Sequence, residues 1–322
     1  MTEETEIVLD RRQLRRSVTF WRALGIGGLA LAFGAFALGG DKLTSLAQPQ
    51  QIARVAIEGT ILESRDQLRM FEKIADSDKV AALLVYVNSP GGTTTGGEAI
   101  HEALRRIAKK KPVVAQFGTV AASAGYIVGM GADHIVARGN TITGSIGVIA
   151  QWPEVASLLD KLGVKVNEVK SGNLKATPSP FLPLDEGGRT VTQNMVNEGF
   201  RWFLAMVEAR RGVKTADIEG LEQGRIFSGR EALAVKLVDE IGGEAEAVSW
   251  LESARGVPKK LKVVDWKPHH DDDWGVPRAS VGITGRGLTE TAVDVVRALG
   301  RDTRLDTLTL DGLVSVWHQS EK

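Results

Sequence analysis

Short apolar runs alternate with helical segments along most of this chain, and this alternation constrains its fold more than any other feature. Six runs have the length and branched content of β-strands: residues 54–61, 80–87, 113–117, 134–137, 147–151 and 164–170. Helical patterns include residues 98–109, 153–162 and 185–211, and a capping box at 228–231 indicates another helix start. Alternating strands and helices form βαβ units with mostly parallel strands. We therefore expect one α/β domain over residues 52–267.

An uncharged run of 18 residues at positions 23–40 follows five arginines. A run of this length can cross a bilayer, and basic flanks stay on the cytoplasmic side. We expect residues 1–22 to be cytoplasmic, 23–40 to be a transmembrane helix and 41–51 to be a linker. The domain would then lie outside the inner (cytoplasmic) membrane. A cleaved signal ending near Ala47 and a buried core helix are the alternatives.

Composition excludes several classes of function. Lys+Arg and Asp+Glu number 40 each, so the formal net charge of zero gives no electrostatic reason to expect a nucleic acid partner. The chain has no cysteine, which excludes disulfides and thiol nucleophiles. The polar run His269-His270-Asp271-Asp272-Asp273 is interpreted as a solvated linker, and we expect no metal and no cofactor. Residues 268–322 are expected to form a tail with short amphipathic segments and a largely apolar end at 308–317.

Two turns rich in small residues follow expected strands. The sequence Asn88-Ser89-Pro90-Gly91-Gly92 exposes backbone N–H groups before a helix, where they could hold an oxyanion or a phosphate. The spacings of phosphate-binding and dinucleotide-binding loops are missing, and a plain tight turn is the alternative. Ser123 lies among alanines and glycines after the strand at 113–117, where a nucleophile would have room for a substrate carbonyl. A buried packing serine is the alternative.

A serine nucleophile needs a base. Three of the five histidines lie in the tail, His101 belongs on a helix face and His134 opens a strand, so a Ser-His-Asp triad is disfavoured. A lysine can replace histidine if burial lowers its pKa from about 10.4 to about 7.5. Lys175 is a candidate because residues 169–184 contain no acid and several apolar side chains. Lys170 lies in the same window, and the residues alone do not choose between the two.

These residues resemble the bacterial signal peptide peptidase A (SppA) family of membrane-anchored serine peptidases, in its short single-domain form, from about residue 55 to 265. Four motifs carry the resemblance: residues 88–92, 121–126, 143–148 and 170–175. The resemblance implies a Clp-protease/crotonase-like fold with repeated βαβ units. It also implies roles for single residues: Ser123 as nucleophile, Lys175 as general base, Gly91 and Gly92 in the oxyanion hole, and Ser145 orienting the lysine amine.

The same resemblance implies a serine endopeptidase that degrades cleaved signal peptides and other hydrophobic or unfolded segments. It further implies a homo-oligomeric ring in which the serine and the lysine come from neighbouring protomers. One departure is Ala124, which stands where the family usually has glycine, and a positive φ there would be costly for alanine. Two alternatives stay open: an inactive membrane scaffold of the same fold, and a crotonase-type acyl-CoA enzyme, for which an exported domain is the wrong location.

Overall fold

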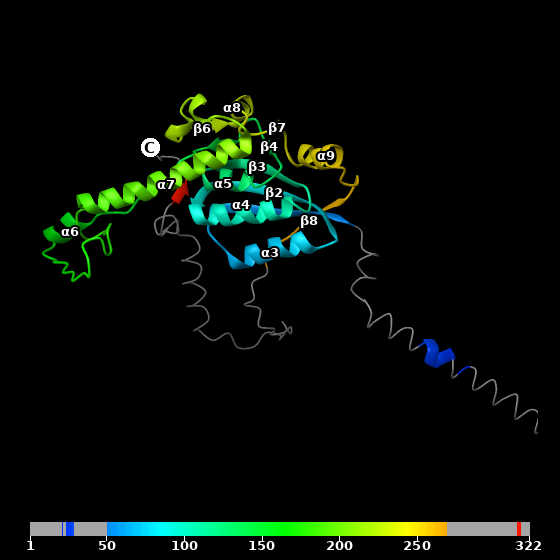
Figure 1. Ribbon diagram of the computed structural model, residues 1–322, viewed down its shortest axis with the longest axis horizontal. Helices are drawn as coiled ribbons and strands as arrows, with labels where there is room; N and C mark the ends of the chain where they lie inside the picture. The colour runs from blue at the N-terminus through cyan, green and yellow to red at the C-terminus, as the bar shows by residue number, and fades with distance from the viewer. Residues whose placement is uncertain (1–20, 22–23, 29–49, 269–313, 317–322) are drawn as a thin grey trace, which may run out of the picture. The chain divides into compact units, whose positions relative to one another are not determined.

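The computed structural model describes residues 21, 24–28, 50–268 and 314–316 (Figure 1). The backbone divides into two compact units, residues 1–50 and residues 51–322. Residues 24–28 of the first unit are helical. Within the described parts of the chain, no helix combines the length and the apolar character needed to cross a membrane. The anchor predicted at residues 23–40 lies mostly outside the described residues.

The second unit is built on a sheet whose strands are mostly parallel, as the βαβ pattern predicted. Its main path runs in the order β6-β5-β3-β2-β1-β8. The central strands are β1 (Gln51–Ile61), β2 (Val80–Thr93) and β3 (Val113–Ala122). The parallel strands around them are β4 (His134–Ala137), β5 (Ile142–Gly144), β7 (Glu240–Ile241) and β8 (Lys262–Asp265). Two pairings are antiparallel: β6 (Ile226–Ser228) with β5, and β9 (Val314–Val316) with β2.

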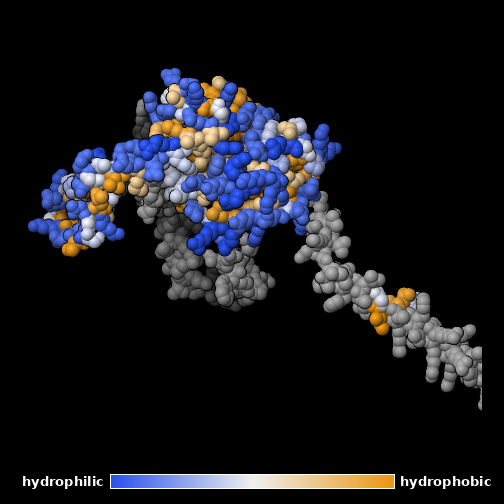
Figure 2. All heavy atoms as spheres, in the orientation of Figure 1, coloured by the Kyte–Doolittle hydropathy of each residue, from blue (hydrophilic) through white to orange (hydrophobic). Residues whose placement is uncertain are grey.

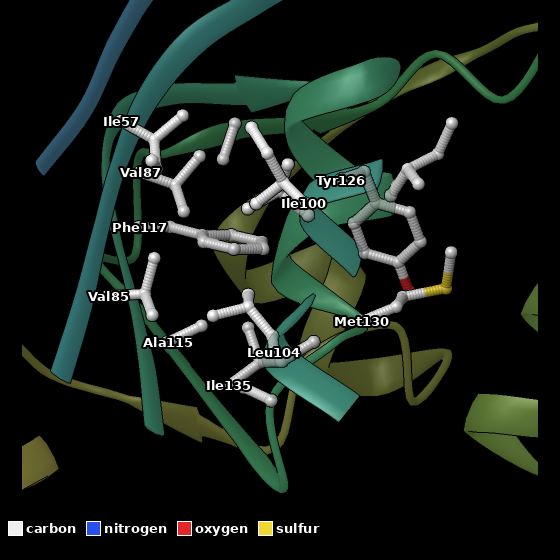
Figure 3. Packing of buried hydrophobic residues seen from close by; sticks show 14 of the residues in the cluster. Ile57, Val85, Val87, Ile100, Leu104, Ala115, Phe117, Tyr126, Met130 and Ile135 are labelled. Carbon is white, nitrogen blue, oxygen red and sulfur yellow. The ribbon is translucent and has the colours of Figure 1, made fainter. Parts of the chain in front are cut away.

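Helices bury both faces of this sheet. One face packs against α3 (Arg65–Asp76), α4 (Thr94–Ala108), α5 (Ala124–Gly129) and the C-terminal half of α7 (Glu186–Arg211). Figure 3 shows the centre of this core, where Phe117 of β3 lies between β2 and the side chains of Leu104 and Tyr126. The Tyr126 hydroxyl donates to the carbonyl oxygen of Leu237 at 2.8 Å, which fixes α5 within the core. The other face packs against α9 (Glu244–Ala254).

Two of the six expected strands are absent. Residues 147–151 contribute no more than one isolated bridge residue, and residues 164–170 have no regular secondary structure. Their valines have high β-propensity, but a strand also needs a neighbour to pair with. Val169 is fully exposed and Val164 is half-exposed, so this segment has neither a sheet partner nor a core to face. The prediction of strands at these two places was therefore wrong.

A small lobe, residues 152–185, lies at the N-terminal end of α7 and carries α6 (Ala156–Lys161). The 26 residues of α7 span about 39 Å. The side chains of Phe203 and Val207 in its second half are buried, whereas the first half is largely exposed. Figure 1 accordingly shows α6 and its loops at the far end of α7, away from the sheet. Asp185 caps the start of α7 and Gly212 ends it with a φ of 64°, as the sequence pattern predicted.

Candidate active site

Ser123 occupies a strained turn between β3 and α5. Its backbone has φ 58° and ψ −120°, a conformation that costs a non-glycine residue on the order of 1–3 kcal/mol. Its N–H donates to the carbonyl oxygen of Gly144 at 2.9 Å, and its own carbonyl accepts from the amides of Tyr126 and Ile127. These bonds join the turn to β5 and to the first turn of α5. A sharp strand-to-helix turn of this kind is how several hydrolases present a nucleophilic serine.

Ala124 does not carry the positive φ that its replacement of glycine would have made costly. The positive φ falls on Ser123, and Ala124 begins α5 with its side chain fully buried. Gly97 of α4 faces it, because a Cβ added to Gly97 would lie 3.3 Å from the Cβ of Ala124. The alanine therefore fits the turn, and its N–H still follows the serine directly.

Ser123 and Ser145 line the same cavity of about 380 Å³. Ser145 has a left-handed φ of 50°, and its N–H donates to the carbonyl oxygen of Arg225 at 3.0 Å. The cavity wall is partly apolar, with Ile146, Val148 and Phe200 among its lining residues. The structure thus brings together two of the predicted site residues, although they are 22 positions apart in sequence.

The predicted oxyanion glycines lie at the end of β2, level with the serine turn. Ser89 of β2 pairs with Ala121 of β3, so Gly91 and Ser123 each lie two residues beyond the same pair. The Gly91 N–H donates to Ser89 Oγ at 3.1 Å, and Ser89 Oγ–H donates to the Gly91 carbonyl oxygen at 3.1 Å. The Gly91 amide is thus bonded within the turn, and Gly92 pairs with Ile61 of β1 and with Ser315 of β9. Sequence reasoning missed this role of Ser89, although a serine two residues before a glycine is a recognisable turn signal.

Position 92 has room for glycine but not for a residue with a side chain. A Cβ at this position would collide with the backbone carbonyl of Ile61 on β1, which pairs directly with Gly92. The close approach of the two strands explains why β2 continues through the glycines instead of ending at Val87.

Lys175 lies in the lobe and is exposed in the single chain. It is not among the described residues that line the cavity of Ser123. The expectation that its apolar sequence neighbours would bury it is wrong for one chain, since Leu174 beside it is itself 53% exposed. Lys170 differs from it in one respect: its ammonium group pairs with Glu168 at 2.5 Å, whereas Lys175 makes no ion pair with any described residue. The two candidate lysines thus differ in their surroundings, and the choice of Lys175 as the base stays a prediction.

Neither of the two described histidines is placed to act as a base for Ser123. His101 of α4 is buried and its Nδ1 donates to the carbonyl oxygen of Ile127 at 3.0 Å, while burial lowers its pKa. The His134 ring stacks on Trp250 and contacts Glu240 at 3.1 Å. Neither ring lines the cavity of Ser123. The other three histidines lie outside the described residues.

Comparisons with known proteins agree with this geometry. The model of peptidase family S49 matches residues 105–258, and the Clp protease model matches residues 59–140. A candidate protease of Synechocystis sp. is 35% identical over 216 residues, which cover 66% of this chain and 78% of that protein. A candidate signal peptide peptidase SppA of Enterococcus faecium is 32% identical over 281 residues, or 82% of this chain and 80% of that protein. This chain belongs to peptidase family S49.

The S49 peptidase is thus a serine-type peptidase of the SppA family, as its motifs predicted, and has the Clp-protease-like α/β fold. Protease 4 of Haemophilus influenzae is 32% identical over 265 residues, which cover 79% of this chain but 43% of that protein. The S49 chain therefore spans less than half of that relative. The match to the S49 model includes Ser123, Ser145 and Lys175, and the individual roles of these residues stay predictions.

Proposed function

We propose that this chain is a membrane-anchored serine endopeptidase that degrades signal peptides and other hydrophobic or unfolded segments. The observation that carries the proposal is the strained Ser123 turn at a cavity shared with Ser145. A buried packing serine gains nothing from such a conformation, whereas a nucleophile gains a fixed direction of attack. The apolar side chains of Ile146, Val148 and Phe200 suit an apolar residue of a bound peptide.

The chemistry follows the Ser/Lys pattern. The neutral amine of Lys175 accepts the proton of Ser123 Oγ as Oγ bonds to the scissile carbonyl carbon. Backbone N–H groups of Ala124 and of the Gly91-Gly92 turn stabilise the negative charge on the carbonyl oxygen. The C–N bond breaks as the lysine returns its proton to the leaving amine, and a water molecule then hydrolyses the acyl-enzyme by the same route. Ser145 hydrogen-bonds the lysine amine and orients it.

The exposure of Lys175 supports a dyad shared between protomers of a ring. A lysine acts as a base once desolvation has made it neutral, and the single chain does not desolvate Lys175. The lobe around it also exposes a set of apolar side chains that a second copy would bury, visible as orange spheres at the left of Figure 2. These side chains are Leu158, Leu162, Val164, Val169, Leu174 and Phe181.

The dyad is tested by alanine substitution. Ser123→Ala and Lys175→Ala should each lower kcat/KM for peptide hydrolysis by at least about 10³-fold. Lys170→Ala is the matched control and should keep most of the activity, because Lys170 is already paired with Glu168. Loss of activity in Lys170→Ala with retention in Lys175→Ala would reverse the assignment of the base. A wild-type chain that reacts with no serine-directed probe would instead be an inactive scaffold.

The proposed anchor is residues 23–40, with the N-terminus in the cytoplasm and the peptidase domain outside the inner membrane. The full chain should remain in the membrane fraction at high salt, and protease added outside spheroplasts should reach the domain beyond Gln51. Recovery of a soluble form that begins near Gln48 would show a cleaved signal instead.

A further inference from the structure

β3 carries a bulge just before the Ser123 turn. Its pairing with β2 passes from residues 87 and 117 directly to residues 89 and 121. One residue of β2, Asn88, therefore lies opposite three residues of β3, and we call residues 118–120 the β3 bulge. Bulges redirect the side chains that follow them and are frequent beside active sites. The β3 bulge ends three positions before Ser123, so its shape sets the direction in which the chain enters the serine turn.

The β3 bulge has no continuous neighbour on its other edge either. β3 pairs with β4 as far as Phe117, and with β5 from Val120 onward. Gly118 and Thr119 lie between these two ladders and line a cavity of about 870 Å³. The bulge is thus held by no continuous backbone ladder, and one side of it is open. Its shape depends on hydrogen bonds from side chains.

Two side chains supply these hydrogen bonds. The Val120 N–H donates to Oδ1 of Asn88 at 3.2 Å. The Thr141 hydroxyl donates to the Gly118 carbonyl oxygen at 2.7 Å and accepts from the Arg138 N–H at 3.1 Å. Thr141 is 1% exposed, so its bonds are shielded from water. Asn88 therefore ties the bulge to β2, and Thr141 ties it to the segment that follows β4.

Gly118 lets the β3 bulge lie close against β2. A Cβ at this position would lie 2.6 Å from the Tyr86 hydroxyl oxygen and 3.1 Å from the Asn88 Cβ. A larger residue would push the bulge away from β2 and lengthen the bond between Asn88 and Val120. The close fit and the two side-chain bonds together give the bulge one conformation.

We infer that Asn88 and Thr141 are positioning residues for Ser123. Neither lines the cavity of Ser123, and both act through the β3 bulge. The strained conformation of Ser123 persists because the surrounding structure imposes it. Without either bond the bulge relaxes, and fewer molecules direct Ser123 Oγ at the scissile carbonyl. The peptide-binding cavity itself keeps its lining residues, so kcat falls while KM changes little. This inference rests on the proposed function for the reaction.

The test compares two substitutions at each positioning residue. Asn88→Leu removes the acceptor at a similar side-chain size, whereas Asn88→Asp keeps an oxygen that accepts from the Val120 N–H. Asn88→Leu should lower kcat for peptide hydrolysis about tenfold, the effect of one lost hydrogen bond, and should change KM by less than about twofold. Asn88→Asp should keep most of the activity. Thr141→Val and Thr141→Ser form a second pair with the same expected difference, because serine keeps the hydroxyl.

Ile74→Val is the control for a general loss of stability. Ile74 lies in α3 and is fully buried, so its shortening lowers the free energy of unfolding without touching the β3 bulge. This variant should have the kcat of the unsubstituted chain. If Asn88→Leu and Asn88→Asp have one kcat, or Thr141→Val and Thr141→Ser have one kcat, the inference is wrong for that residue.

Hydrogen exchange separates this inference from the proposed function, because it needs no peptidase activity. Mass spectrometry of the segment 118–127 should show exchange about tenfold faster in Asn88→Leu than in the unsubstituted chain, and no such increase in Asn88→Asp. If exchange differs as expected but no chain hydrolyses any peptide, the positioning of the turn stands and the peptidase proposal fails. If the unsubstituted chain hydrolyses peptides and Asn88→Leu matches it in kcat and in exchange, the peptidase proposal stands and the positioning role is wrong.

Discussion

At the residue scale, the backbone at and next to the Ser123 turn has several positive φ angles. Ser123, Gly144 and Ser145 all have positive φ, with values of 58°, 82° and 50°. The Gly144 carbonyl accepts from Ser123, and the Arg225 carbonyl accepts from Ser145, so each of the two strained serines is held by a hydrogen bond to a residue distant in sequence. Strain of this kind persists when the surrounding structure over-determines it, and it fixes the direction of a side chain at no further entropic cost during reaction.

His101 gives the fold a pH dependence that can be measured. Burial is the largest cause that lowers its pKa, and Arg210 and Arg105 lower it further, although the bond to Ile127 raises it. The folded state therefore keeps the ring neutral below the ordinary histidine pKa of 6.5. As the pH falls through 6.5 toward the lower folded value, the unfolded chain binds a proton that the folded chain refuses. The free energy of unfolding should thus decrease over this window.

The variant His101→Asn should show a smaller decrease in the free energy of unfolding between about pH 7.5 and about pH 5. Asparagine keeps an N–H donor for the Ile127 carbonyl but has no proton to bind in this range. Urea unfolding curves at both pH values measure the difference. An identical pH dependence in both chains would show that His101 titrates alike when folded and unfolded.

At the scale of elements, the two halves of α7 lie in different environments: the second half is packed in the core and the first half is largely exposed. Phe203 in its second half is fully buried, whereas Met195 in its first half is 51% exposed and shares a face with Val191 one turn earlier. The hydrophobic surface of the first half is thus without cover in one chain. The second half belongs to the core, and the first half continues the exposed apolar surface of the lobe.

Two substitutions in α7 should therefore act differently. Phe203→Ala should lower the free energy of unfolding by about 3–5 kcal/mol, because it opens a cavity in the core. Met195→Asp should change it by less than about 0.5 kcal/mol, but should weaken self-association. Urea unfolding measures the first effect, and sedimentation velocity measures the second. Association unchanged by Met195→Asp would show that this face of α7 lies outside the interface between copies.

The sequence predicted those elements whose causes are local. The first half of β2 is the continuous apolar run 80–87, α7 lies between its caps Asp185 and Gly212, and the capping box of α8 (Gly229–Ala234) forms as expected. The Ser123 turn was recognisable from its small residues. β9 was not, because a three-residue strand is set by a distant partner and not by its own pattern. The exposure of Lys175 was missed for a similar reason, since nearby apolar residues bury a lysine only if the chain folds around it.

At the scale of the whole molecule, the two predicted catalytic residues, Ser123 and Lys175, lie in different parts of the chain. Ser123 lies in the core of the sheet unit, while Lys175 lies on the lobe at the far end of α7. A head-to-tail ring repeats one heterologous interface, so the lobe of each protomer can meet the serine turn of the next. Such an arrangement would desolvate Lys175 and cover the apolar lobe by the same contact. It would make activity a property of each pair of neighbouring protomers.

Mixed rings should recover activity that neither variant has alone. When Ser123→Ala and Lys175→Ala chains are unfolded together and reassembled at equal ratio, a competent site needs an intact serine from one chain and an intact lysine from the next. Each condition is met with a probability of about one half, so about a quarter of wild-type activity should return. Two affinity tags, one on each variant, show by sequential capture that mixed rings have formed. Mixed rings as inactive as either variant alone would place both residues of each site in one chain, and would require the lobe to fold back and bury Lys175 within its own protomer.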